Sequence, residues 1–104
     1  MTLTEFVAAF ETIAPIAYAA FKEPPSNPYM VYFIEEESDF MADNKHYFDK
    51  DNGALELYTE IKDEAVEAQI ETRFEELHIP YQRVSSAWIN TEKLVQTVWY
   101  FQIT

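Results

Sequence analysis

The interval at which apolar residues recur changes twice along the second half of this sequence, and the change restricts the folds open to it. Apolar residues alternate with polar ones over residues 55–61 and recur every three or four positions over residues 66–77, and a run rich in branched and aromatic residues at 94–103 again places most of its apolar residues on one strand face. An interval of two is typical of a half-buried strand, and an interval near 3.6 is typical of an amphipathic helix. The second half is therefore predicted to contain strands on either side of one helix.

The predicted helix of the second half has clear signals at both ends. Asp63 can cap its first turn with a side-chain oxygen, and Pro80 stops it. Two long strands, over residues 81–90 and 94–103, are expected to follow, with a short turn between them. The predicted buried side chains are Val66, Ile70, Phe74 and Leu77 in the helix, and Val95, Thr97, Trp99, Phe101 and Ile103 in the last strand.

A shorter helix is predicted at the N-terminus. Thr2 and Glu5 have the spacing of a capping box, in which each side chain accepts a hydrogen bond from the other residue's backbone N–H. Pro15 disfavours a helical conformation in the residue before it, so the helix is expected to stop near Ile13. Its apolar face comprises Phe6, Phe10 and Ile13.

The region between the two helices is expected to be mostly extended. Residues 16–21 look extended, and the proline-rich residues 23–28 form a loop. The continuous aromatic and branched run at residues 29–34 predicts a strand that is covered on both faces. A further strand is expected at residues 44–48, and the Asp-Asn-Gly sequence at residues 51–53 predicts a hairpin turn. In the strand that follows, the predicted buried face comprises Leu55, Leu57, Thr59 and Ile61.

These elements together predict a single α+β domain over residues 1–104. Their order is helix, three strands, helix, two strands. Short connections favour a mainly antiparallel sheet of about five strands, with both helices packed on one face.

The charge of the chain is strongly negative and unevenly placed. Nineteen acids and seven bases give a net charge of −12, and residues 35–76 alone hold fifteen of the acids and four of the bases. Such a surface repels phosphates, so direct binding to nucleic acid or to an anionic membrane is not expected. The absence of cysteine fits a reducing compartment, and neither a signal peptide nor an apolar run long enough to span a bilayer is visible.

Four glutamates of the second helix form an acidic stripe, which is expected on its exposed side: Glu64, Glu67, Glu71 and Glu75. Like charges four residues apart destabilise a helix by about 0.2–0.5 kcal/mol per pair, and Arg73 is the only base of the helix. Simple solvation explains such a stripe. The functional alternative is a surface that meets a basic partner or repels a polyanion.

The residues needed for catalysis are scarce in this sequence. It has no cysteine, one glycine and two histidines, so thiolate chemistry, a phosphate-binding glycine loop and a histidine metal cluster are all unsupported. His46 and His78 are given structural roles. We therefore expect no enzymatic activity, no catalytic residues, no metal and no cofactor.

Several short motifs resemble those of one protein class. They are FKEPP at residues 21–25, PYMVY at 28–32, DFMADNK at 39–45 and ELYT at 56–59, ahead of an acidic helix. In these the chain resembles the small head–tail connection and tail-terminator (tail completion) proteins of long-tailed phages and prophages of Gram-positive bacteria. The likeness extends from about residue 15 to the C-terminus.

This resemblance implies a non-enzymatic virion part with an α+β fold, made in the host cytoplasm. Proteins of this kind form a ring, often of six subunits, that ends the tail tube and offers a surface to the head. The implied partners are further copies of the chain, the tail-tube protein and a head-completion protein. The alternative from another class is an acidic inhibitor that mimics DNA and blocks a nucleic-acid-binding protein.

A candidate partner-binding segment follows the strand at residues 29–34. Apolar residues beside dense carboxylates are costly to expose and useful at a contact. We expect the exposed sheet edges to take part with this segment. Its candidate residues are Glu35, Glu36, Glu37, Asp39, Phe40 and Met41.

Overall fold

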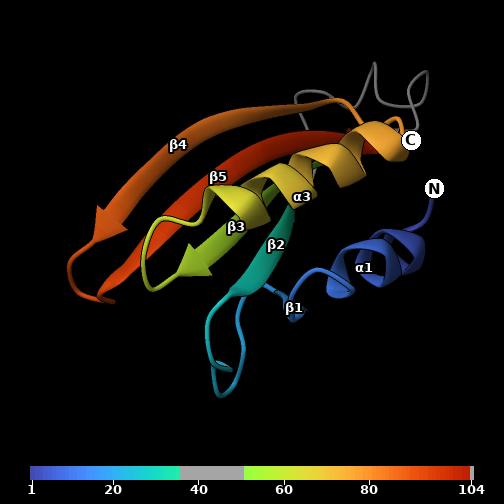
Figure 1. Cartoon of the computed structure of the whole chain (residues 1–104). Coiled ribbons are helices and arrows are strands. Elements are labelled where there is room, and N and C mark those ends of the chain that lie inside the picture. The colour runs from blue at the N-terminus through green and yellow to red at the C-terminus, as the bar shows by residue number, and fades with distance from the viewer. Residues whose placement is uncertain (36–50, 104) are drawn as a thin grey trace, which may run out of the picture.

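The computed structural model describes residues 1–35 and 51–103, and in this part of the chain two helices lie against a five-stranded sheet (Figure 1). The elements are α1 (Leu3–Glu11), β1 (Ile16–Tyr18), β2 (Tyr29–Glu35), β3 (Asp51–Thr59), α3 (Glu64–Glu76), β4 (Tyr81–Ile89) and β5 (Leu94–Ile103). This confirms the predicted α+β class and the order helix, three strands, helix, two strands.

The strands are arranged in the order β1-β2-β3-β5-β4. β1 pairs with β2 in parallel, whereas the other three pairings are antiparallel. Both helices pack on the same face of the sheet, as predicted, because Phe6 of α1 and Phe74 of α3 both contact the ring of Phe101 on β5, at centroid distances of 4.6 and 5.7 Å. The fully buried side chains of this layer include Phe6, Phe10, Met30, Leu55, Leu57, Ile70, Phe74 and Trp99.

The predicted helix signals are all present. The Thr2 hydroxyl accepts from the Glu5 backbone N–H at 3.1 Å, and the Glu5 carboxylate accepts from the Thr2 backbone N–H at 2.7 Å. Helix α1 ends at Glu11, slightly before the expected position. The Asp63 carboxylate accepts from the Val66 backbone N–H at 3.2 Å and so caps α3.

The hairpin turn predicted at residues 51–53 is wrong, because these residues belong to β3. Gly53 pairs with Ile34 on one side and with Phe101 on the other. A Cβ atom at this position would lie 2.6 Å from the Phe101 ring and 2.6 Å from the carbonyl oxygen of Phe33. Glycine is therefore required here by close packing within the sheet rather than by the conformation of a turn.

Three smaller predictions also need adjustment. β1 ends at Tyr18 rather than at residue 21. β2 is covered on both faces only near Met30 and Val31, since Phe33 is 37% exposed. Ile61 lies beyond the end of β3 and is 76% exposed, so it does not share the buried face. The strand predicted at residues 44–48 lies outside the described residues.

Candidate protein interface

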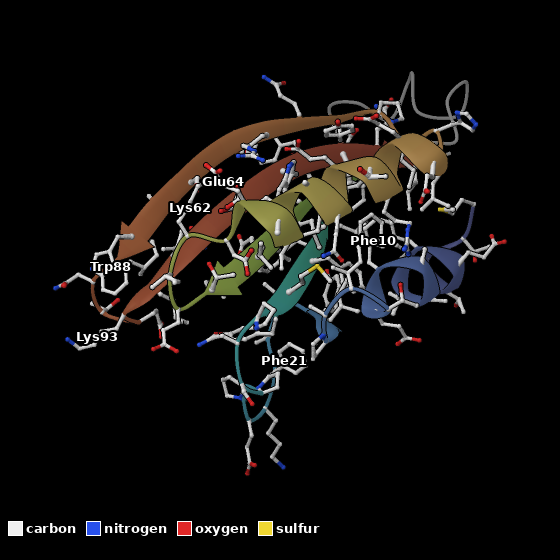
Figure 2. The ribbon with its side chains drawn as sticks, viewed as in Figure 1. Phe10, Phe21, Lys62, Glu64, Trp88 and Lys93 are labelled. Carbon is white, nitrogen blue, oxygen red and sulfur yellow. The ribbon has the colours of Figure 1, made fainter. Side chains whose placement is uncertain are left out.

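Two of the four glutamates of the acidic stripe, Glu67 and Glu71, face strands β4 and β5, which corrects the prediction that the whole stripe lies on the exposed side of the helix. Glu67 is only 1% exposed. Its carboxylate lies 2.9 Å from the guanidinium of Arg83 on β4 and 2.9 Å from the ammonium of Lys62. Lys62 lies just before the start of α3 (Figure 2). The Thr97 hydroxyl of β5 donates a further hydrogen bond to Glu67 at 3.1 Å.

Glu71 continues this network one helical turn further on. Its Oε2 accepts from Arg83 at 2.8 and 2.9 Å and from the indole N–H of Trp99 at 2.8 Å. The guanidinium carbon of Arg83 also lies 5.5 Å from the centre of the Trp99 ring. Burial lowers the pKa of Arg83, but the hydrogen bond and the charge of Glu71, together with Glu67, outweigh that effect and raise it.

The two remaining members of the stripe lie at its ends. Glu75 is exposed and accepts a hydrogen bond from the hydroxyl of Tyr81 at 2.6 Å. That bond, followed by burial, raises the pKa of Tyr81 to about 12. Glu64 is exposed at the N-terminal end of α3 (Figure 2).

The spacing of the glutamates identified a common face but not its direction. Successive helix residues are about 100° apart, so Glu67 lies only about 60° around the helix from the buried Ile70. These glutamates therefore lie next to the apolar face of α3, and they come close to the sheet because that apolar face packs on it. One signal for its partner is present in the sequence, because Arg83 lies two residues from Tyr81 and so shares its inward-facing side of the strand.

The opposite face of the sheet is not covered by either helix. The strand register places on this face the aromatic and aliphatic residues Tyr29, Val31, Phe33, Ala54, Tyr58, Val98 and Tyr100, of which Val31 and Val98 are buried. Tyr100 is 58% exposed and Phe33 is 37% exposed. Among the residues of the described strands, this face carries the carboxylates of Glu35 and Glu56 and no lysine or arginine.

Several side chains on this face, which neither described helix covers, contact one another. The rings of Tyr29 and Tyr58 stack with centroids 5.2 Å apart. The Tyr58 hydroxyl donates to Glu56 at 2.8 Å and accepts from the Gln96 amide at 2.8 Å. Burial, followed by the hydrogen bond to Glu56, raises the pKa of Tyr58 to about 12. An aromatic surface of this kind is suited to packing against another protein.

A hollow of about 490 Å³ opens beside this face. Its walls are mainly apolar, with one carboxylate and one amide. The lining residues are Phe33, Glu35, Asn52, Gly53, Ala54, Tyr100 and Phe101.

Only the first residue of the predicted partner-binding segment can be placed. Glu35 is exposed at the end of β2. Glu36, Glu37, Asp39, Phe40 and Met41 lie outside the described residues, as does His46, so the role predicted for that segment stays a prediction.

Two further observations concern other classes of site. Residues 1–35 and 51–103 contain no cluster of three or more histidine, aspartate or glutamate side chains arranged to hold a metal ion. In the same residues, neither helix has the length and apolar character needed to cross a bilayer.

The sequence matches no protein-family model, and no curated protein shows significant similarity to it.

Proposed function

We propose that this chain is a structural phage protein that completes the tail, forming part of the head–tail junction as a ring of identical subunits. The observation that carries the proposal is the sheet face that neither described helix covers, where Tyr100 and Phe33 are exposed and where no basic residue lies among the described strand residues. Contiguous aromatic surface of this kind is characteristic of contacts between proteins.

Two further features support this role. The α+β fold, with helices on one face of a sheet, is the fold that the resemblance to tail-completion proteins implies. The net charge of −12 also suits a channel through which DNA passes, since an acidic lining repels phosphates and keeps the nucleic acid from sticking.

The contacts of the acidic stripe do not favour the DNA-mimic alternative. A mimic must present free carboxylates at the positions where a partner expects phosphates. Glu67 and Glu71 are instead occupied by Arg83, Lys62 and Trp99 of the same chain. A basic partner would have to displace these contacts before it could bind the stripe.

The test is a binding assay with purified tail tubes of the phage or prophage that encodes this chain. Wild type should cap the tubes, and Tyr100→Ser should weaken capping because it removes an exposed aromatic ring. Gln69→Ser, on the exposed surface of α3, is the matched control and should cap normally. A Phe40→Ser, Met41→Ser double variant tests the segment predicted from the sequence.

Failure of wild type to bind any tube or head component would overturn the proposal and favour the inhibitor alternative. Equal capping by Tyr100→Ser and wild type would remove the uncovered face from the interface. The neighbouring genes provide an independent check, because tail-tube and tape-measure genes are expected beside this one.

A further inference from the structure

Strand β4 is a long edge strand with little protection against pairing. Within the described residues its backbone pairs only with β5, and the strand order places it at one edge of the sheet (Figure 1). Natural edge strands are usually blocked by proline, by outward charges, by bulges or by being short. β4 has nine residues with no proline, lysine or acid, and its one bulge lies between Arg83 and Ser85. Residues 85–89 therefore form a regular, uncharged edge.

The only charge on β4 is turned away from that edge. The guanidinium of Arg83 is held by Glu67 and Glu71 of α3. The ammonium of Lys62, which bonds to the Ser86 hydroxyl at 2.7 Å, is likewise held by Glu67. Residues 77–104 carry one acid and two bases, whereas residues 35–76 carry fifteen acids and four bases. The β4–β5 hairpin thus contributes little of the charge that would repel another strongly acidic chain.

We propose that β4 pairs in an antiparallel manner with β4 of a second copy of this chain, through residues 85–89. A two-fold axis at Ala87 would place Trp88 opposite Ser86 of the partner subunit, and Ile89 opposite Ser85 of the partner subunit. The contact would cover Trp88, which is 54% exposed and lies at the end of the β4–β5 hairpin (Figure 2). It would join two five-stranded sheets into one.

The length of the strands favours this two-fold arrangement over a head-to-tail one. The opposite edge of the sheet is β1, which has three residues and could satisfy only a small part of the nine-residue β4 edge. A second β4 offers the same length and the same neutral side chains. The pairing goes beyond the tail-completion role. A ring closes through head-to-tail contacts and not through a two-fold one, so the pairing concerns the free chain and the ring would use a different contact. Each proposal can therefore fail alone.

The charge of the chain gives the pairing a distinctive salt dependence. Two chains of net charge −12 repel one another at low salt. Screening reduces that repulsion while leaving backbone hydrogen bonds and apolar contacts in place. Sedimentation equilibrium should therefore show a dimer that forms more tightly at 0.5 M than at 0.05 M sodium chloride, the opposite of a contact held by ion pairs.

Amide hydrogen exchange locates the contact in wild-type protein. As the protein concentration rises, the backbone amides of residues 85–89 that face the open edge should exchange at least tenfold more slowly, and those of α3 should not change. A dimer whose exchange is unchanged over residues 85–89 would overturn the proposal, as would a chain that stays monomeric at millimolar concentration in 0.5 M salt.

A charge placed in the strand supplies the complementary test. Ala87→Lys should weaken dimerisation at least tenfold, because it sets two lysines face to face at the two-fold axis. The substitution also lowers the net negative charge, which by itself would favour association, so a loss cannot be assigned to general repulsion. Gln69→Lys makes the same charge change on the exposed surface of α3 and should dimerise like wild type. Equal dimerisation by Ala87→Lys would refute the pairing.

Discussion

Arg83 connects two glutamates of α3 to strand β4, and its removal provides the sharpest test of the packing between helix and sheet. It lies 2.9 Å from the carboxylate of Glu67 and 2.8 Å from that of Glu71. Arg83→Met keeps the length and much of the apolar volume of the side chain but removes its charge. Glu67, which is 1% exposed, would then be left with Lys62 and Thr97 as its partners.

The expected cost follows from the burial of Glu67. Removing one partner of a buried ion pair typically destabilises a protein by about 3–5 kcal/mol, because the remaining charge is buried without compensation. Here Lys62 still pairs with Glu67 and the Arg83 side chain is itself 37% exposed, so we expect the lower end, about 3 kcal/mol. A small domain has only about 5–15 kcal/mol of stability in total, so the loss is large.

Urea unfolding followed by tryptophan fluorescence measures this loss, since Trp99 is fully buried and bonds to Glu71. With a urea dependence of about 1–3 kcal/mol/M, the midpoint should fall by about 1–3 M at an unchanged slope. Lys22→Met removes a charge from an exposed loop residue and should change stability by less than about 0.5 kcal/mol.

A second substitution separates the uncompensated charge from a general loss of packing. Glu67→Gln in the Arg83→Met background removes the charge that Arg83 had balanced, so the double variant should be less destabilised than the sum of the two single variants. If Arg83→Met costs no more than the Lys22→Met control, or if the two changes simply add, the proposed role of this network is wrong.

Three other predictions follow from the structure. Phe74→Ala should cost about 3–5 kcal/mol in urea unfolding, because its fully buried ring touches four other aromatic rings; an unchanged midpoint would contradict this packing. Gly53→Ala should destabilise by about 1–3 kcal/mol, because the new methyl group would overlap the ring of Phe101, and unaltered stability would show that the sheet relaxes freely. The pKa values of Tyr58 and Tyr81 are raised from 10.0 to about 12, so the folded state holds both protons more tightly than the unfolded state does. The free energy of unfolding should therefore fall as the pH rises from 10 to 12. Replacing both residues by phenylalanine should flatten that dependence.

The sequence alone was sufficient for the order of the elements and for the direction of most side chains. Capping by Thr2 and by Asp63, and the branched and aromatic run of β5, depend on residues within a few positions of one another. Such signals are readable because the geometry of a helix or a strand is fixed locally. The buried faces of α3 and β5 followed from the same local periodicity.

Tertiary structure alone decided the surroundings of the acidic stripe and of Gly53. The glutamate spacing defined a helix face, but only the packing of α3 on the sheet brought Arg83 and Lys62 to Glu67. The Asp-Asn-Gly sequence has the residues of a turn, yet the ring of Phe101, 48 positions away in the chain, makes glycine necessary inside a strand. Both outcomes depend on contacts between residues far apart in sequence, which local spacing does not encode. For the same reason the uncovered sheet face and the open edge of β4 became visible only once all five strands were in register.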